Sequence, residues 1–282
     1  MTEPLAATLA VPGATVYYET RGTGPTLLLI PGGNGDVGPY DRLAAHLADR
    51  FTVTAYERRG FSRSPIQVPL DEAERLRADA DDAIRVLDAV GQQAAFVFGS
   101  SSGAIVGLDM LARHADRVRT LVAHEPPLVE LVPDAEQVKA ILDDVYATYR
   151  RAGVQVAMSK FTEQIFGEPG LRRPDMPPGA ELPKPVIDMM ARMQTNLLFW
   201  MEHELRQYPR YRPDTEALRA LSAKLVLAGG EESRDTFPYR PNLTLAERLG
   251  RKVVDFPGDH TGYVIEPVGF ASRLAEILSA TQ

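Results

Sequence analysis

The feature that most constrains the fold of this chain is the alternation of short apolar runs with longer helix-like segments. The run "TLLLI" (26–30) ends at Pro31-Gly32-Gly33, which is typical of a strand buried on both faces. A helical pattern follows at 40–48, and a second strand-like run, "FTVTAY", follows at 51–56. Strands that alternate with helices imply βαβ units, and therefore a mostly parallel sheet covered by helices on both faces.

The same alternation continues along the chain. The N-terminal stretch "ATLAVPGATVYYETRG" predicts a hairpin with Pro12-Gly13 in its turn. We further expect helices over 71–90 and 102–112, and strands at "AAFVFG", "RTLVAHE" (119–125), "AKLVLAGG" (223–230) and "RKVVDFPG" (251–258). The sequence thus predicts the α/β class.

One long segment interrupts this pattern. It is helical in character and rich in Met, and it contains the proline-rich break "RRPDMPPGAELPKP" (172–185). We therefore divide the chain into a first core part (1–132), a helical insertion (133–214) and a second core part (215–282).

The insertion carries an apolar stripe at helical spacing. Its members are Val186, Met189, Met190, Met193, Leu197, Trp200 and Met201. The simplest interpretation is that this face packs on the core. A functional interpretation is that Met193, Leu197 and Trp200 roof a substrate cleft, where flexible Met side chains adapt to an apolar ligand.

Composition excludes several classes of protein. The 282 residues carry a formal net charge of −7 without a long basic run, so we expect no nucleic-acid partner. The lack of cysteine excludes disulfides, thiolate metal sites and a cysteine nucleophile. No run approaches the length of a membrane span, and the N-terminus does not resemble a signal peptide. We expect a cytoplasmic protein that needs no metal or cofactor and acts on a small molecule.

The stretch "FVFGSSSGAIVG" contains the best candidate for a nucleophile. Gly99 to Gly103 fit the pattern G-x-S-x-G, with Ser101 at the centre. A buried strand precedes the pattern and a helix follows it, which predicts a sharp turn that projects the central hydroxyl above the sheet edge. The helix also points backbone N–H groups at charge that develops beside this hydroxyl.

A serine hydroxyl needs a base to remove its proton. Of the five histidines, His46, His114 and His203 lie in helical patterns and His124 ends a strand. His260 lies in the glycine-containing loop "FPGDHTGY" after the last strand, where a side chain can extend over the sheet edge. We therefore assign His260 as the base, in agreement with the order of elements in this class of motif.

An imidazole base needs an acid to hold its tautomer. Glu232 is our first choice, because it follows the strand "KLVLAGG" at the usual place for such an acid. Glu125, at the end of the preceding strand, and Asp235 are the alternatives.

The oxyanion formed by serine attack needs two backbone N–H donors. We expect one from Ser102, which follows the nucleophile, and the other from Gly33 in the loop "IPGGNGDVG", with Asn34 next in order. This loop lacks the Lys-Ser/Thr of a P-loop and the G-x-G-x-x-G fingerprint, so a nucleotide site is not indicated.

Taken together, these segments resemble the α/β-hydrolase superfamily over nearly the whole chain. The resemblance is carried by "LLLIPGG", "YERRGFSRS" (56–64), "FGSSSGA", "LVLAGGEE" and "FPGDHTGY", in that order. It implies a sheet of about eight strands and a helical cap inserted after the sixth strand. It also implies that Arg59 and Ser62 brace the loop near the oxyanion hole. The chain departs from many members in having Pro31-Gly32 where they have His-Gly, and Glu where the acid is commonly Asp.

The function predicted is that of a cofactor-independent serine hydrolase acting on a small, largely apolar ester, lactone or related acyl compound. The same scaffold supports C–C cleavage, lyase action and cofactor-free oxygenation, because function depends on the site rather than on the fold. A non-catalytic binding protein is the third alternative.

Overall fold

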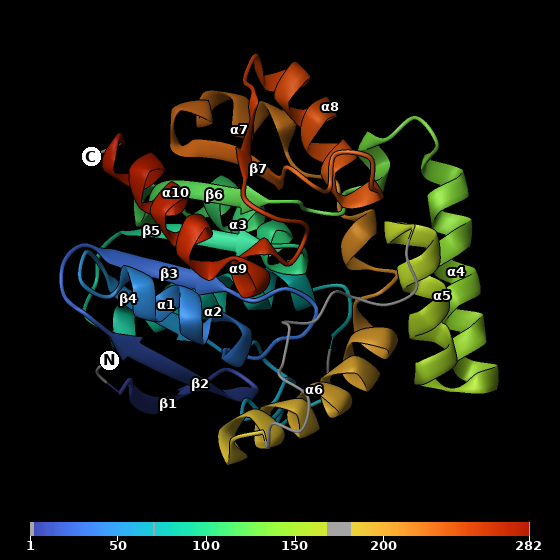
Figure 1. Cartoon of the computed structure of the whole chain (residues 1–282), viewed down its shortest axis with the longest axis horizontal. Helices are drawn as coiled ribbons and strands as arrows, with labels where there is room; N and C mark the ends of the chain where they lie inside the picture. The colour runs from blue at the N-terminus through green and yellow to red at the C-terminus, as the bar shows by residue number, and fades with distance from the viewer. Residues whose placement is uncertain (1–2, 70, 168–181, 282) are drawn as a thin grey trace.

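The computed structural model describes residues 3–69, 71–167 and 182–281. Within these ranges the strands form one eight-stranded sheet in the order β1-β2-β4-β3-β5-β6-β7-β8 (Figure 1). The strands are β1 (Leu5–Val11), β2 (Ala14–Arg21), β3 (Thr26–Ile30), β4 (Thr52–Tyr56), β5 (Ala95–Ser100), β6 (Val118–His124), β7 (Leu225–Gly230) and β8 (Val253–Phe256). This is the predicted α/β sheet.

The sheet is antiparallel at one edge and parallel elsewhere. The predicted hairpin pairs β1 with β2 antiparallel, and β2 also pairs antiparallel with β4. All other neighbours are parallel. Every residue of β3 and β5 is buried, which explains why their sequences are apolar almost without interruption. The carboxyl ends of the parallel strands therefore all lie at the same end of the sheet, where side chains from separate loops meet.

Helices cover both faces of the sheet. One face packs against α2 (Arg75–Ala89), α3 (Ser102–Arg113), α7 (Thr215–Ala220) and α8 (Arg240–Leu249). The other face packs against α1 (Asp41–Leu47), α9 (Gly262–Ile265) and α10 (Pro267–Ser279). Two separate apolar clusters result, one on each side of the sheet.

Three longer helices lie between β6 and β7 in the chain, in the insertion that the sequence indicated. They are α4 (Ala135–Ala152), α5 (Val154–Phe166) and α6 (Lys184–His203). They pack around a third apolar cluster that includes Leu142, Ile165 and Met201. In Figure 1 they lie along one side of the sheet and do not extend its layers. Most of the proline-rich segment of the insertion falls outside the described residues.

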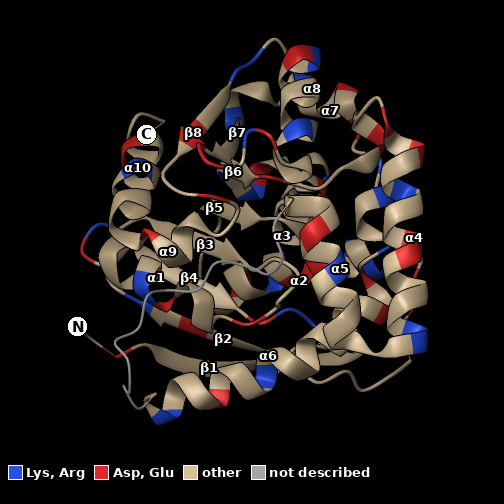
Figure 2. Cartoon of the chain, turned by 45° about the vertical axis from the view of Figure 1, so that its right-hand side comes forward, with Lys and Arg blue, Asp and Glu red and all other residues tan. Residues whose placement is uncertain are grey.

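The surface carries charges of both signs. Lys, Arg, Asp and Glu are interspersed over the outer helices in the view of Figure 2. Among the described residues, no helix has the length and apolar character that crossing a bilayer requires.

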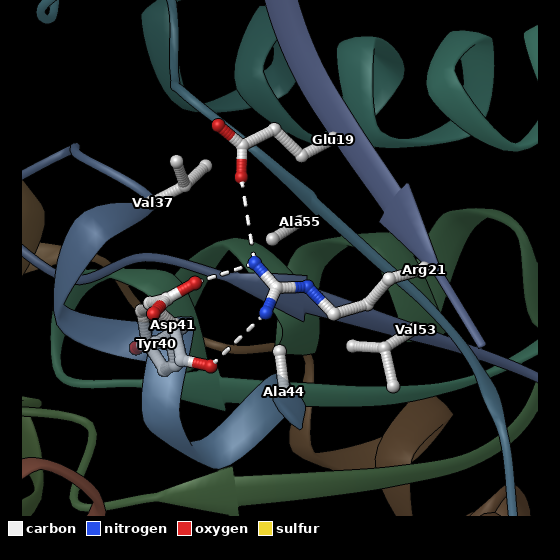
Figure 3. Close-up of a pocket in the computed structure, with 8 residues that line it drawn as sticks. All are labelled: Glu19, Arg21, Val37, Tyr40, Asp41, Ala44, Val53 and Ala55. Atoms are coloured by element: carbon white, nitrogen blue, oxygen red, sulfur yellow. Dashed lines mark hydrogen bonds and ion pairs between the residues drawn. The ribbon is translucent and has the colours of Figure 1, made fainter. Parts of the chain in front are cut away.

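A small pocket lies between β2, β4 and the start of α1 (Figure 3). It has about 230 Å³ of empty space, part of it open to solvent. The Arg21 guanidinium lies across it and pairs with Asp41 and Glu19. The pocket contains none of the residues that the sequence assigned to the reaction, so it is not the candidate site.

Candidate active site

Ser101 occupies the sharp turn between β5 and α3. Its backbone has φ 56° and ψ −124°, and its amide donates to the His124 carbonyl at 2.9 Å. The flanking glycines are required by close backbone approach. A Cβ on Gly99 would lie 2.4 Å from the Gly103 carbonyl oxygen, and one on Gly103 would lie 2.2 Å from the Ile30 oxygen. The turn is strained, and its outer positions, Gly99 and Gly103, have no room for a side chain.

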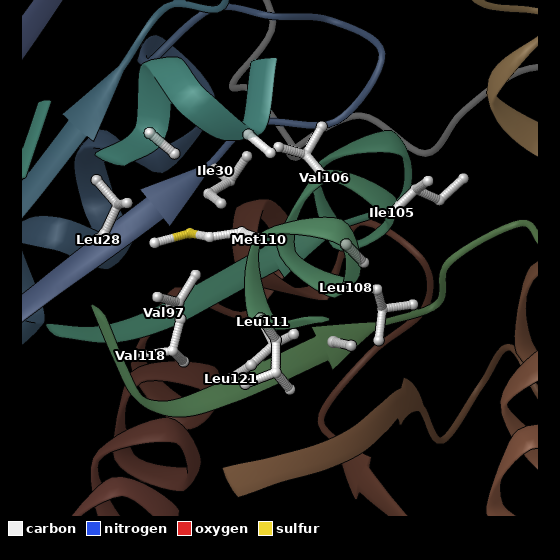
Figure 4. Packing of buried hydrophobic residues seen from close by; sticks show 14 of the residues in the cluster. Leu28, Ile30, Val97, Ile105, Val106, Leu108, Met110, Leu111, Val118 and Leu121 are labelled. Carbon is white, nitrogen blue, oxygen red and sulfur yellow. The ribbon is translucent and has the colours of Figure 1, made fainter. Parts of the chain in front are cut away.

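Packing of α3 holds this turn in place. Ile105, Leu108 and Leu111 of α3 are fully buried against β3, β5 and β6. Figure 4 shows part of this cluster, with Met110 and Leu111 of α3 near Val97 and Leu121 of the sheet. The helix therefore begins at a fixed point, and the Ser102 amide is its first. That amide finds no acceptor among the described residues, which leaves it available to a ligand.

The neighbouring serines have different surroundings. Ser100 is fully buried and its Oγ lies 3.3 Å from Nδ1 of His124. Ser102 is also buried, at 4% exposure. Ser101 is partly exposed, so its hydroxyl has the freedom to meet a substrate that the other two lack.

His260 forms a short hydrogen bond with Glu125. The Nδ1–Oε2 distance is 2.6 Å, the carboxylate is fully buried, and the His260 side chain is 13% exposed. Burial alone would raise the pKa of Glu125. The hydrogen bond and charge of His260, together with the Gly230 amide, outweigh burial and lower that pKa. An ionised carboxylate only accepts hydrogen bonds, so His260 carries its proton on Nδ1 and leaves Nε2 free to act as a base.

This pairing involves Glu125, one of the two alternative acids, and not Glu232, the first choice from the sequence. The carboxylate at His260 belongs to Glu125, after β6, whereas Glu232 and Asp235 have exposed side chains in the loop after β7. The amide of Glu232 donates to the Gly258 carbonyl at 3.0 Å, so the backbone of this loop turns toward the end of β8. The carboxylate in contact with His260 therefore comes from the end of β6 and not from the loop after β7.

Two glycines at the end of β7 lie against the Glu125 carboxylate. The Gly230 amide donates to its Oε1 at 2.7 Å. A Cβ on Gly229 would lie 3.3 Å from the same oxygen and 2.4 Å from the Tyr239 ring. A strand-end glutamate, combined with Gly-Gly at the end of the next strand, was therefore the sequence signal that favoured Glu125.

His124 lies beneath the site as a neutral residue. It is fully buried, and burial lowers its pKa to about 4. Its ring is 6.3 Å from that of His260 between ring centres, and its carbonyl accepts the amide of Ser101. His124 thus lies between the turn of Ser101 and the loop of His260.

Backbone strain concentrates around these residues. Within the described residues, Ser62, Ser101 and Glu125 are the non-glycine positions with positive φ, at 47°, 56° and 49°. Such conformations cost of order 1–3 kcal/mol each and cluster at functional sites. Two of the three are residues that the sequence assigned to the reaction.

The loop after β3 passes beside Ser101. A Cβ on Gly32 would lie 3.1 Å from Cβ of Ser101, so the loop backbone passes directly beside the serine. Gly33 is partly exposed and its amide has no acceptor among the described residues. Asn34 is engaged in holding the loop: its carbonyl accepts from Asn196 of α6 at 2.6 Å, and its side chain accepts from the Asp36 amide.

The loop after β4 contributes two arginines with separate partners. Arg58, not Arg59, contacts the loop after β3, through hydrogen bonds to the carbonyls of Pro31 and Gly32. Arg59 pairs with Asp82 of α2. The expected bracing role of Arg59 is therefore corrected, because its guanidinium pairs with Asp82 of α2 and not with the loop after β3.

Ser62 does brace the loop after β3. Its Oγ donates to Asp36 at 2.7 Å, and its amide donates to Asn196 at 2.8 Å. Arg192 of α6 pairs with the same carboxylate of Asp36. The loop is thereby joined to the insertion through polar contacts.

Aromatic side chains of the insertion lie against the site residues. A Cβ on Gly33 would lie 2.5 Å from Nε1 of Trp200, so the indole covers this glycine. The Phe166 ring is 5.2 Å from that of His260, and the Phe161 ring is 5.1 Å from that of Trp200. Phe161 and Phe166 were missed in the sequence, because they lie on α5, outside the stripe that was considered.

The other residues of the predicted stripe differ in their exposure. Met193 and Leu197 are half-buried, Met201 is buried in the insertion, and Met190 is 44% exposed. One part of the stripe therefore packs inside the insertion, and another part is partly exposed.

The remaining histidines lie elsewhere. His46 is exposed, and His114 and His203 pair with carboxylates, those of Asp81 and Glu72. Across the described ranges, no group of three or more His, Asp or Glu side chains is arranged to hold a metal ion.

Comparisons with known proteins agree with this architecture. The family profile described as alpha/beta hydrolase fold matches residues 25–266. An uncharacterized hydrolase, YraK, from Bacillus subtilis (strain 168) is 36% identical over 96% of this chain and 95% of its own. A zearalenone hydrolase from Bionectria ochroleuca is 30% identical over 96% of each chain.

Solved structures show the same fold. An alpha/beta hydrolase from Sphaerobacter thermophilus DSM 20745 superposes with a TM-score of 0.68 at 23% identity, covering 96% of this chain and 100% of the other. A thermophilic esterase from Thermogutta terrifontis superposes with a TM-score of 0.69 at 21% identity, covering 99% of each.

Proposed function

The chain belongs to the alpha/beta hydrolase fold family, and on that premise we propose that it is a serine hydrolase of apolar esters or lactones. The observation that carries the proposal is the 2.6 Å hydrogen bond between His260 and the buried Glu125, at the same sheet edge as the strained Ser101. This combination supplies a nucleophile, a base with a fixed tautomer and an ionised acid.

The proposed reaction begins with proton transfer. Nε2 of His260 takes the hydroxyl proton of Ser101 as Oγ attacks the carbonyl carbon of the substrate. The imidazolium is stabilised by the Glu125 carboxylate and then gives the proton to the leaving oxygen, so that an acyl-enzyme and an alcohol form. Water, deprotonated by His260, attacks the acyl group and releases the acid, which restores the free serine.

The amides of Gly33 and Ser102 are the proposed oxyanion donors. Both lack an acceptor among the described residues, and both belong to segments fixed by packing or hydrogen bonds. Donors that are already oriented stabilise the developing negative charge without reorganisation during the reaction.

The aromatic side chains of the insertion support an apolar substrate. Phe166 lies beside His260 and Trp200 covers Gly33, so an acyl or alcohol group bound there would meet apolar rings. Similarity to the zearalenone hydrolase makes zearalenone, a macrocyclic lactone, the first substrate to test. A p-nitrophenyl ester of a medium-chain acid is the second.

The proposal is tested by replacing the nucleophile. Ser101→Ala is expected to abolish turnover of both substrates and covalent labelling by a fluorophosphonate. Ser272→Ala, at an exposed position on α10, is the matched control and is expected to behave as the wild type. Mass spectrometry of the products identifies the bond that breaks: ester or lactone hydrolysis adds one water and gives an acid and an alcohol, a lyase adds no water, and C–C cleavage gives fragments divided at a carbon–carbon bond. Labelling that persists in Ser101→Ala, at a site mapped to another residue, would refute the proposal.

A further inference from the structure

Arg58 is a fully buried arginine whose five N–H groups all have acceptors. Nε donates to the Pro31 carbonyl at 3.0 Å, and Nη2 donates to the Gly32 carbonyl at 2.7 Å. Nη1 and Nη2 both donate to Glu204, at 2.7 and 2.8 Å, and Nη1 also donates to Asp79 at 2.8 Å. The planar guanidinium is therefore fixed from every side.

These contacts determine the direction of the backbone amides in the loop after β3. The described residues contain no cis peptide bond, so in each peptide unit of this loop the C=O and the N–H point in opposite directions. Because Gly32 directs its C=O toward Arg58, the N–H of Gly33 points away from it. Gly32 itself lies directly beside Ser101, so this peptide unit lies next to the proposed nucleophile, and its Gly33 N–H has no acceptor among the described residues.

We propose that Arg58 is a positioning residue, which aims the Gly33 amide at the substrate oxyanion by holding the Gly32 carbonyl. The inference rests on the proposed serine hydrolase function and deepens it. Arg58 touches no substrate and acts only through the orientation of the peptide between Gly32 and Gly33.

The acids around Arg58 extend this role to the insertion. Glu204 follows the last residue of α6, the helix that also carries Trp200. Asp79 comes from α2, so helices from the insertion and from the core hold the same guanidinium. The position of α6 is thereby coupled to the orientation of the Gly33 amide.

The chain offers a matched control in the next residue. Arg59 is also largely buried and also forms a bidentate pair, with Asp82, but its contact with loop backbone is to Pro12 and not to the loop after β3. Arg58→Lys and Arg59→Lys each replace a fork of five donors by a point charge with three. Only the first removes hydrogen bonds from the proposed oxyanion loop.

The experiment compares two readouts in these variants. The first is the separate change in kcat and in KM for the p-nitrophenyl ester. The second is the dissociation constant of phenylboronic acid, which adds to a serine hydroxyl as a tetrahedral anion. For Arg58→Lys we expect kcat to fall roughly 10- to 100-fold, KM to change by less than about threefold, and boronate binding to weaken roughly in step with kcat. For Arg59→Lys we expect both readouts to stay within about threefold of wild type at a comparable loss of thermal stability.

The outcomes separate this inference from the proposed function. Equal effects of Arg58→Lys and Arg59→Lys on kcat and boronate affinity would overturn the positioning role. If Arg58→Lys yields no folded protein, Glu204→Gln takes its place, since it keeps the arginine and removes the acid that orients it. Unchanged kcat and boronate affinity in that variant would likewise overturn the inference. A wild-type protein that binds no boronate would refute the serine hydrolase proposal, and the inference with it.

Discussion

Nδ1 of His260 lies 2.6 Å from Oε2 of Glu125, a residue 135 positions earlier in the chain. The two residues follow strands β8 and β6, which are not neighbours in the sheet, because β7 lies between them. Gly229 of β7 has no side chain to crowd the carboxylate, and the Gly230 amide binds its other oxygen. The pair therefore depends on three successive strands.

Removing the charge of Glu125 is expected to reduce catalysis strongly. Glu125→Gln keeps the shape of the side chain but cannot hold the same His260 tautomer or stabilise an imidazolium. We expect kcat to fall on the order of 10³- to 10⁴-fold. The measurement is steady-state hydrolysis of the p-nitrophenyl ester.

The controls for Glu125 are the two other acids that the sequence offered. Glu232→Gln and Asp235→Asn are expected to keep kcat within about threefold of wild type, because their side chains are exposed in the loop after β7. A loss in Glu232→Gln as large as that in Glu125→Gln would show that the acid has been misassigned.

The serines beside the nucleophile are expected to tolerate substitution differently. Ser102→Ala should keep kcat within about threefold of wild type, because the proposed contribution of Ser102 is its backbone amide. Ser100→Ala should lower the free energy of unfolding by about 1 kcal/mol, because it removes the partner of His124 Nδ1. Kinetics and chemical denaturation measure the two effects. A loss of activity in Ser102→Ala comparable to that in Ser101→Ala would contradict the assignment.

Gly33→Ala is expected to displace the indole of Trp200. The new Cβ would lie 2.5 Å from Nε1 and 2.7 Å from Cδ1 of that ring. We expect kcat/KM to fall by about tenfold or more, because either the indole or the loop must shift. Trp200 is the one tryptophan of the chain, so its fluorescence reports the displacement directly, as a shift of the emission maximum.

Gly269→Ala on α10 is the matched substitution for Gly33→Ala. Its Cβ would meet Pro257 at 3.4 Å, an ordinary van der Waals contact. We expect its emission spectrum and kcat/KM to match the wild type. An unchanged spectrum in Gly33→Ala as well would contradict the close packing of Trp200 on the loop.

His124 is expected to make stability depend on pH below neutrality. Burial lowers its pKa from 6.5 to about 4 in the folded state. Between these values the unfolded chain binds more protons than the folded one, so the free energy of unfolding falls as pH falls from 6.5 to 4. The contribution of His124 over this interval is on the order of 3 kcal/mol.

A variant without the imidazole isolates this contribution. His124→Asn is expected to be less stable at pH 7, but its stability should fall less steeply between pH 6.5 and 4. Urea denaturation at several pH values measures both slopes. If the free energy of unfolding changed with pH equally steeply in the variant and the wild type, a neutral, buried His124 would be excluded.

The fold could be predicted from local sequence patterns. The hairpin around Pro12-Gly13 and the buried runs of β3 and β5 occur where the patterns placed them, because apolar periodicity reflects which faces of an element are buried. The turn at Ser101 was also predictable from local sequence, because its glycines are imposed by backbone contacts within one βα unit and with the adjacent strand.

The contacts around the proposed site depended on long-range geometry instead. Which carboxylate meets His260 is decided by the path of the loop after β7, by the missing side chain at Gly229 and by the amide of Gly230. Sequence spacing gives the order of these residues but not the direction of their side chains.

The sequence by itself determined the architecture and the strained turn at Ser101, because both follow from periodicity and from backbone sterics within a few residues. Only the tertiary structure decided that Glu125 pairs with His260, that Arg58 rather than Arg59 holds the Gly32 carbonyl, and that Trp200 covers Gly33. Each of these contacts joins segments far apart in the chain. The packing of strands and helices decides which residues meet in these contacts, and local sequence patterns do not predict that packing.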